Sequence, residues 1–147
     1  MKSVKVSKNS VTTKYEAEDV ELFKNELFIY LLAKQKNICF IPKILSYDCD
    51  KLIICTKNVG ISMQDYCDGY GCEFDDFIPG IRTIYNKLVK FGYYHNDLRL
   101  KNIVINPNNE KLYLIDFEFT DREYKDLDEE DIVKQISRKT RSKKKSR

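Results

Sequence analysis

Four short polar side chains near the end of the chain have types and spacing that could bind a cation and activate a hydroxyl group. They are His95, Asp97, Asn102 and Asp116. The first three lie just before an apolar run, and Asp116 directly follows a second apolar run. If these runs pair as antiparallel strands, the loop before the first strand lies beside the end of the second. Carboxylate and amide oxygens suit Mg²⁺, which also bridges to phosphates, and a further carboxylate can accept a proton from a hydroxyl.

The order of these residues is more specific than any one of them. Singly, each acid could cap a turn in a polar hairpin. Together they form His-x-Asp-x-x-x-x-Asn, then two apolar runs, then Ile115-Asp116-Phe117. This is the order of the catalytic loop and the metal-binding triplet in protein kinases. On these motifs the chain resembles the protein-kinase-like superfamily, most closely over residues 93–119.

This resemblance implies a role for each residue of the motif. Asp97 would be the catalytic base or would orient the acceptor hydroxyl, while Asn102 and Asp116 would hold Mg²⁺ for a bound ATP. Arg99 stands where protein kinases often carry a lysine that contacts phosphate. Its guanidinium would keep the positive charge of that lysine but would present it as a fork of N–H donors. His95 matches the structural histidine of the loop. The implied cofactors are therefore ATP and Mg²⁺.

Two residues depart from the pattern of protein kinases. Asn96 replaces the arginine that often follows the histidine, which argues against activation through a phosphorylated loop. Glu118 replaces the glycine of the triplet. The combination of His-Asn-Asp with Ile-Asp-Phe-Glu is also similar to choline, ethanolamine and aminoglycoside kinases, which phosphorylate small hydroxyl compounds.

The elements that must position these residues begin with strands and a helix. Residues 2–15 alternate loosely and predict one or two short strands. Apolar side chains at helical spacing predict a helix over Val20–Lys34, with Asp19 as its N-cap. Two β-rich runs, Ile44–Tyr47 and Lys51–Thr56, are separated by a short polar turn and predict a hairpin.

The second half of the chain predicts helices followed by the hairpin that carries the motif. In chain order these are a helix over 62–66 capped by Ser62, a helix from Pro79 to about Gly92, strands over 103–105 and 112–115, and a short helix over 128–136.

This order of strands and helices is typical of an α+β chain, and the resemblance implies a miniature two-lobe protein-kinase-like fold. The N-lobe, a truncated sheet with one helix, would span about residues 1–57, and the mainly helical C-lobe about 58–137. Residues 138–147 hold seven Lys or Arg and no acid, so they are expected to form a disordered basic tail.

The resemblance also places the nucleotide contacts. Lys14 would contact the ATP phosphates, and Glu26 in the first expected helix would be its ion-pair partner, with Glu21 as the rival. A solvated surface position remains the alternative for Lys14 and for Glu26. Lys57 and Val59 would offer backbone groups to adenine from the hinge between the lobes.

Two parts of a full kinase are not expected here. The 13 residues before Lys14 contain no glycine, so they cannot form the usual Gly-rich loop over the phosphates. The 31 residues after Asp116 contain no Ala-Pro-Glu segment and leave little room for later helices. The substrate platform would then be minimal or would come from a protein partner.

Composition restricts the class of protein. Apolar residues make up 42% and the net charge is +3, which is typical of a globular domain and does not by itself imply nucleic acid. The five cysteines are odd in number and lack Cys-x-x-Cys spacing, which favours free thiols in a reducing compartment. Without an apolar signal region or a run of 18 apolar residues, we expect an intracellular protein, cytoplasmic or nuclear, with no contact with a membrane.

Several hypotheses about function follow. The first is ATP-dependent transfer of the γ-phosphoryl group to a hydroxyl, with a protein Ser or Thr as the first acceptor and a small alcohol as the second. A nucleotide-binding pseudokinase or scaffold is the alternative, because transfer depends heavily on positioning and the Gly-rich loop is missing. Nucleic-acid binding through the basic tail is the last, because the body of the sequence shows no basic stripe interleaved with aromatic residues.

Overall fold

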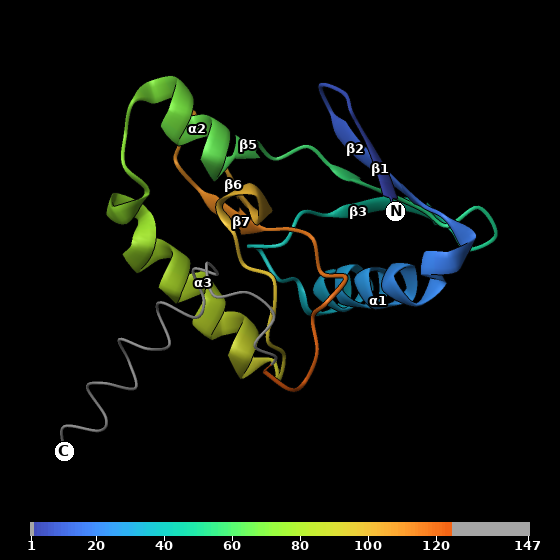
Figure 1. The fold of residues 1–147 in the computed structure, drawn as a ribbon. Helices are drawn as coiled ribbons and strands as arrows, with labels where there is room; N and C mark the ends of the chain where they lie inside the picture. Colours follow the sequence, from blue (N-terminus) through green and yellow to red (C-terminus); the bar gives the residue numbers. More distant parts are fainter. Residues whose placement is uncertain (1, 125–147) are drawn as a thin grey trace, which may run out of the picture.

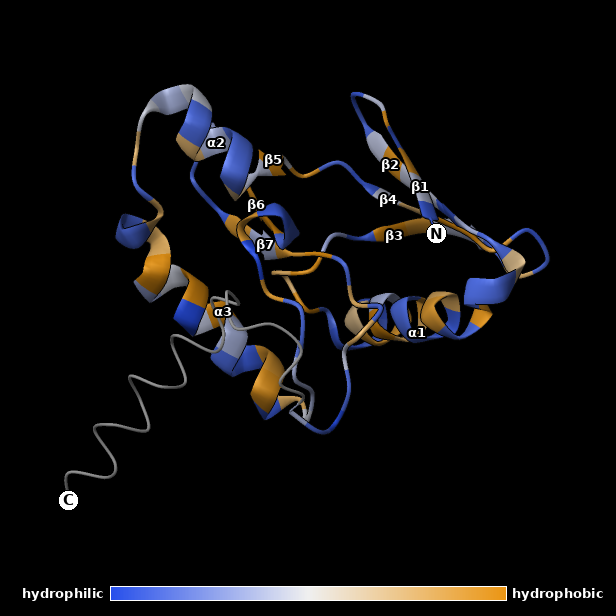
Figure 2. Cartoon of the chain, in the orientation of Figure 1, coloured by the Kyte–Doolittle hydropathy of each residue, from blue (hydrophilic) through white to orange (hydrophobic). Residues whose placement is uncertain are grey.

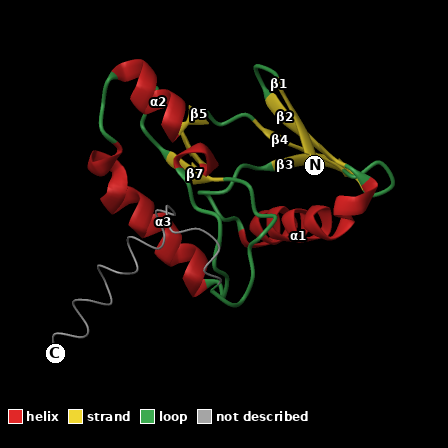
Figure 3. Cartoon of the chain, in the orientation of Figure 1, coloured by secondary structure: helices red, strands yellow, loops and turns green. Residues whose placement is uncertain are grey.

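The computed structural model describes residues 2–124, which fold into two parts around a shared core (Figure 1). The strands are β1 (Lys2–Val6), β2 (Ser10–Tyr15), β3 (Ile44–Asp48), β4 (Ile53–Lys57), β5 (Ile61–Ser62), β6 (Ile103–Ile105) and β7 (Leu112–Leu114), the helices are α1 (Val20–Lys36), α2 (Met63–Tyr70) and α3 (Ile78–Lys90), and short 3-10 turns lie at Ala17–Asp19, Phe74–Phe77 and Leu100–Asn102. Figure 3 shows α1 beside the first group of strands, and α2 and α3 beside the second. The prediction of an α+β chain is confirmed.

The first sheet is antiparallel, with the strand order β1-β2-β4-β3. In its register Lys2 lies opposite Tyr15, and Val4 lies opposite Thr13. Because side chains alternate between the two faces of a strand, these four residues share one face, which is turned toward α1. The predictions of strands over residues 2–15 and of a hairpin, formed by β3 and β4, are confirmed.

Helix α1 ends two residues beyond its predicted end, at Lys36. Asp19 is at the N-cap position, but its side chain makes no capping hydrogen bond, because its backbone (φ −103°, ψ 23°) lacks the extended conformation that capping requires. The helix stops where Asn37 takes a left-handed conformation. Its buried side chains are Phe23, Glu26, Leu27, Ile29, Tyr30 and Ala33. The helix therefore carries one acid, Glu26, on its apolar face.

The second part is built around a small sheet with the order β5-β6-β7, in which β6 is buried along its whole length. Helix α2 follows Ser62, whose hydroxyl accepts a hydrogen bond from the N–H of Asp65 at 3.1 Å. The predicted cap is thus confirmed, although the helix continues through Tyr70. Helix α3 carries Pro79 in its first turn, as predicted, whereas the two-residue strand β5 was not predicted.

One apolar core continues through both parts (Figure 2). Ile54 in the first part, and Leu98 and Phe117 in the second, are among its most deeply buried side chains. The N–H of Leu114 also donates to the carbonyl of Phe40 at 2.9 Å, across the boundary between the parts. Separating the two parts would therefore expose this core to water and break backbone hydrogen bonds.

The predictions for the last residues concern a segment outside the described part of the chain. The expected helix over 128–136 and the basic tail over 138–147 both lie there. Within residues 2–124, all five cysteines are free thiols. No helix in that part of the chain combines the length and apolar character needed to cross a membrane.

The chain passes from the first part to the second through residues 57–60, where the hinge was expected. Gly60 has a φ of 153°, a conformation that favours glycine. A Cβ atom at this position would collide with the carbonyl oxygen of Ile105 and would lie 3.0 Å from the Cα of Asn106. The missing side chain at Gly60 therefore allows the hinge to lie directly against the end of β6.

We predict that Gly60→Ala lowers the free energy of unfolding by about 1–3 kcal/mol, the usual cost of overpacking, because β6 must move away from the hinge. Gly69→Ala in α2 is the matched control, since nothing lies within 4 Å of its Cβ position and alanine favours a helix by up to about 1 kcal/mol. Urea unfolding followed by circular dichroism would measure both variants. Equal free energies of unfolding for Gly60→Ala and Gly69→Ala would contradict the close packing at the hinge.

Candidate functional site

A cleft lies between the first sheet and the second part of the molecule. It is lined by Val4, Val11 and Thr13 on the sheet side, by residues 56–60 at the hinge, by Val104 from β6, and by Glu26, Tyr30, Ile115 and Asp116 at its inner end. The cleft encloses about 90 Å³. This is well below the roughly 300–1,000 Å³ common for pockets that hold drug-sized ligands, so the cleft is narrow.

His95 connects the loop that carries Asp97 to the strand end that carries Asp116. Its side chain is fully buried. The N–H of Asp97 donates to Nδ1 of the ring at 3.2 Å, so the ring proton lies on Nε2, which donates to the carbonyl of Ile115 at 2.7 Å. Burial lowers the pKa of His95, which keeps the ring neutral at neutral pH. The histidine therefore joins the two halves of the motif without carrying charge.

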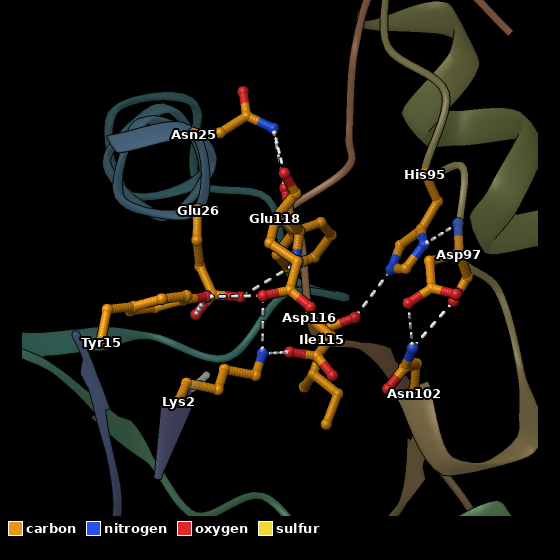
Figure 4. Close-up of polar contacts among 11 residues, drawn as sticks. Lys2, Tyr15, Asn25, Glu26, His95, Asp97, Asn102, Ile115, Asp116 and Glu118 are labelled. Carbon is orange, nitrogen blue, oxygen red and sulfur yellow. Dashed lines mark hydrogen bonds and ion pairs between the residues drawn. The ribbon is translucent and has the colours of Figure 1, made fainter. Parts of the chain in front are cut away.

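Asp97 is oriented by two neighbouring side chains. The amide Nδ2 of Asn102 donates to the carbonyl of Asp97 at 2.8 Å and lies 3.3 Å from its Oδ2. Nε of Arg99 donates to Oδ1 of Asp97 at 2.8 Å. Because Asn102 uses its amide N–H groups in these bonds, its Oδ1 is left to meet a cation. Figure 4 shows this oxygen on the side of Ile115 and Asp116.

Asp116 has an unusual backbone conformation at the end of β7. Its φ of 66° lies in the left-handed region, which residues other than glycine rarely adopt. The residues on either side are held by hydrogen bonds: the N–H of Ile115 donates to the carbonyl of Asn102 at 3.0 Å, and the N–H of Phe117 donates to Oε2 of Glu26 at 2.9 Å. Strained conformations of this kind persist where the surroundings impose them, often at functional sites.

Glu26 is a buried carboxylate at the inner end of the cleft, with 3% of its surface exposed. Besides the bond from Phe117, its Oε1 accepts a hydrogen bond from the hydroxyl of Tyr15 at 3.0 Å. Burial raises the pKa of Glu26 to about 7; the charge of Asp116 adds to the rise, whereas Lys2 and the two hydrogen bonds oppose it. Glu26 therefore changes its protonation state near neutral pH.

Lys2 projects from β1 into a group of three carboxylates (Figure 4). Its ammonium pairs with Asp116 and lies 3.3 Å from Oε2 of Glu118. The same Oε2 lies 3.2 Å from the hydroxyl of Tyr15. Burial alone would lower the pKa of Lys2, but the negative charges of Glu26, Asp116 and Glu118 outweigh burial and raise the pKa overall. Lys2 therefore stays cationic, beside the carboxylate that was expected to hold the metal.

The prediction that Lys14 reaches the cleft is wrong. Lys14 is exposed, because β2 turns Thr13 and Tyr15 toward the cleft and α1, and turns the alternate residues away. Lys2 lies opposite Tyr15 on the neighbouring strand and takes the place that was expected for Lys14. The regular alternation of Val11, Thr13 and Tyr15 was the signal in the sequence that could have shown this.

Other residues expected at the site do lie at the cleft. Glu26 faces it, whereas the side chain of its rival Glu21 is 81% exposed. Lys57 and Val59 line the cleft at the hinge. The N–H of Lys57 donates to the carbonyl of Lys43 at 2.8 Å, so its own carbonyl is the backbone group that it can offer to a ligand.

Three residues of the site were not predicted, namely Lys2, Tyr15 and Glu118. The contact of Lys2 with Asp116 spans almost the whole described sequence, so no local pattern indicates it. From its neighbours in the sequence, Tyr15 was expected only to be an apolar residue of a strand. Only Glu118 carried a signal, because it stands where the kinase triplet has glycine, and its side chain now proves to face Lys2 and Tyr15.

Two asparagines hold the segment that follows Asp116. Nδ2 of Asn25, on α1, lies within 3.1 Å of three backbone carbonyls in residues 117–120; its two hydrogens must be shared among them. Asn96, with a φ of 69°, donates to the carbonyls of Phe119 and Glu123, both at 3.0 Å. The segment is therefore held from both parts of the molecule.

The oxygen donors at the cleft fit Mg²⁺. Asn102 offers Oδ1, and Asp116 offers a carboxylate that already attracts the ammonium of Lys2. Mg²⁺ keeps several waters and commonly takes one or two protein oxygens together with phosphates. Across residues 2–124, no three His, Cys, Asp or Glu side chains are grouped so that they could hold a metal. The fit is thus to an ion bound largely by water and phosphate.

Comparisons with known proteins give matches at the level of structure. No family model and no curated protein matches the sequence. Two structures of WbdD, a bifunctional kinase-methyltransferase, match with TM-scores of 0.58 and 0.61, each at 18% identity over 82% of this chain. The kinase PK-1 of the Cydia pomonella granulovirus matches with a TM-score of 0.63, at 16% identity over 76% of this chain.

The chain therefore has a protein-kinase-like fold, which is the fold that the resemblance implied. It spans 30%, 33% and 43% of the lengths of the three matched chains, respectively. The similarity thus concerns less than half of each of these proteins, and at such low identity it concerns their fold alone.

The contribution of Glu26 to the free energy of unfolding should fall as the pH rises from about 5 to 8, because folding favours the protonated form of its carboxyl group. The carboxyl ionises near pH 4.5 in the unfolded chain and near pH 7 in the folded one. Stability linked to this group is therefore fully present below pH 4.5 and is lost as the pH rises through 7. At about 1.4 kcal/mol for each pKa unit, the loss is on the order of 3 kcal/mol.

Guanidinium unfolding of three proteins at pH 5, 6, 7 and 8 would test this prediction. Glu26→Gln, which cannot ionise, should remove most of the fall in stability seen with the unchanged protein. Glu21→Gln, at an exposed position of the same helix, should retain it. A fall that persists in Glu26→Gln would show that another group is responsible.

Proposed function

We propose that the chain is an ATP-dependent phosphotransferase that transfers the γ-phosphoryl group to a hydroxyl. The observation that carries this proposal is the arrangement of Asp97, Asn102 and Asp116, whose two segments are joined by His95 beside a cleft. Each carboxylate and the amide has a partner that orients it before any substrate binds, and such preorganisation is the main requirement for phosphoryl transfer.

Asp97 would act on the acceptor hydroxyl. In this reaction the hydroxyl oxygen forms a bond to the γ-phosphorus, the bond from that phosphorus to the β–γ bridging oxygen breaks, and Asp97 accepts the hydroxyl proton. The bonds from Asn102 and Arg99 fix the orientation of the Asp97 carboxylate. The side chain of Arg99 is 42% exposed, so it can also place its charge near the transferred phosphoryl group.

Asn102 and Asp116 would hold the Mg²⁺ of the nucleotide, which neutralises charge on the phosphates when bound. The adenine would lie in the narrow cleft, where Val11 and Val104 line opposite walls and suit a flat ring. Backbone groups of the hinge, at Lys57 and Val59, would bind its polar edge.

Lys2 would contact the phosphates in place of Lys14. This role requires a cation next to the metal position, and Lys2 meets the requirement through its contacts with Asp116 and Glu118. Its pKa is raised, so it remains charged. On β2 the residue that faces α1 is Tyr15. Its hydroxyl makes the direct bond to Glu26 that was expected for the ammonium of Lys14.

A protein Ser or Thr hydroxyl is the first candidate acceptor, and a small alcohol is the second. Glu118 was the sequence feature that favoured the small alcohol. Its side chain faces Lys2 and Tyr15 inside the site, which accounts for its presence without reference to the acceptor. The order of the two candidates is therefore kept.

Nucleotide binding without transfer is a second candidate function. The direct pairing of Lys2 with Asp116 favours it, because these two groups must separate before Asp116 can hold the metal that transfer requires. Turnover of ATP distinguishes the two candidates.

We predict that Asp97→Asn and Asp116→Asn each lower phosphoryl transfer by at least about 100-fold, because one variant loses the proton acceptor and the other loses a charged metal ligand. Asp50→Asn, in an exposed turn, is the control and should keep full activity. The measurement is transfer of labelled phosphate from ATP with Mg²⁺ to a basic protein and to choline, which also separates the two acceptors. Full activity in both site variants would exclude the mechanism, and ATP binding without turnover in the unchanged chain would select the second candidate.

Lys2→Met should lower kcat/KM for ATP by about 100-fold, the usual scale for one charge-stabilising donor, because methionine keeps the length of the side chain but removes its charge. Lys14→Met should change it by less than about twofold, since Lys14 is exposed on the face of β2 opposite to Tyr15. Melting temperatures would show whether both variants fold. If kcat/KM for ATP fell only in Lys14→Met, the phosphate contact would belong to Lys14 and not to Lys2.

A further inference from the structure

A second hollow lies next to the hinge, where the end of α1, the loop into β3 and strand β7 meet. It encloses about 340 Å³, within the range of roughly 300–1,000 Å³ common for ligand pockets. All of the charged side chains in its lining are lysines, namely Lys34, Lys43, Lys57 and Lys111.

A third hollow continues from the second one. It also encloses about 340 Å³, and both are lined by Lys57, Val59 and Tyr113. It adds Lys8, from the turn between β1 and β2, and its lining contains no acid. We call the two hollows together the basic groove. This groove runs from the end of α1 to the β1–β2 turn.

The basic groove has no counter-charge of its own among the described residues. All five lysines are exposed, and none of them pairs with an acid within residues 2–124. Glu110, the sequence neighbour of Lys111, instead accepts a hydrogen bond from the hydroxyl of Tyr66 at 3.0 Å. Like charges gathered along one groove repel one another, and a bound polyanion would offset this repulsion.

We infer that the basic groove binds single-stranded nucleic acid. Five lysines spread along two connected hollows suit a chain of phosphates, whereas a single phosphate group would need them gathered at one point. Tyr113 lines both hollows, and the ammonium of Lys111 lies 5.1 Å from the centre of its ring. Grooves that combine lysines with an aromatic surface on which a base can stack are the usual means of binding single strands.

This inference does not depend on phosphoryl transfer. Of the five lysines, only Lys57 also lines the nucleotide cleft. The basic groove is not visible as a stripe in the sequence, because its lysines come from five separate segments that only the fold brings together.

The test is binding of a fluorescent oligouridylate of roughly 20 nucleotides, longer than one such site usually covers, to the full chain. Fluorescence anisotropy would be measured at several salt concentrations. Lys43→Gln combined with Lys111→Gln should weaken binding at least tenfold. It should also reduce the salt slope by about 1.4, because each phosphate contact on a single strand contributes about 0.7. Lys87→Gln combined with Lys90→Gln, exposed at the end of α3, removes the same charge and should change the affinity by less than twofold.

Any of four outcomes would overturn the inference. Equal weakening by both pairs of substitutions would indicate general charge attraction without a site. Full displacement of the oligonucleotide by inorganic tripolyphosphate at equal phosphate concentration would indicate a site for a compact anion. Loss of binding on removal of residues 138–147, with no effect of Lys43→Gln and Lys111→Gln, would assign binding to the tail. If the double variant melts early, each single variant should still reduce the slope by about 0.7, and an unchanged slope in both would overturn the inference.

Discussion

The arrangement of the whole site depends on one buried carboxylate, that of Glu26. A carboxylate removed from water is costly unless hydrogen-bond donors surround it. Here the donors are the hydroxyl of Tyr15 and the N–H of Phe117, so satisfying Glu26 ties strand β2, helix α1 and the segment around Asp116 to one point. The same carboxylate attracts Lys2 and thereby helps to keep it charged. A single helix position thus determines where an acid, a hydroxyl and a lysine meet.

The triplet is held from the other part of the molecule by a neutral group. His95 donates to the carbonyl of Ile115 and accepts from the N–H of Asp97, so the loop that carries Asp97 and the segment that carries Asp116 are linked by one ring. Because Ile115 and Phe117 are bonded on opposite sides of Asp116, its left-handed backbone is imposed by both parts of the protein together. The arrangement of Asp97 relative to Asp116 therefore requires the complete fold, and neither part could maintain it alone.

The sequence predicts this protein best where the relevant contacts are local. The order of strands and helices, the Ser62 cap and the hairpin that bears the motif depend on neighbours a few residues apart, and these predictions are confirmed. Lys14 was misplaced although Val11, Thr13 and Tyr15 alternate along β2, a local pattern that puts Lys14 on the opposite face. Lys2 could not be recognised, since its role arises from pairing with Tyr15 across the sheet and from contact with a residue more than 100 positions away. The basic groove likewise exists only after distant segments have come together.

The position of β1 at the edge of its sheet would affect how fast the proposed nucleotide leaves the cleft. Among the described residues, β1 is paired on one side only, and it carries Lys2, which pairs with Asp116 at the inner end of the cleft. Parting the two halves of the molecule would break the bonds of Asn25 and Glu26 on one side of the triplet or those of His95 on the other. Lifting β1 would break its ladder with β2, the contacts of Lys2 and the bond from Asn58 to the carbonyl of Ser7. Under the function proposed above, a spent nucleotide would therefore leave by the fraying of one edge strand, which breaks fewer contacts than the opening of the hinge.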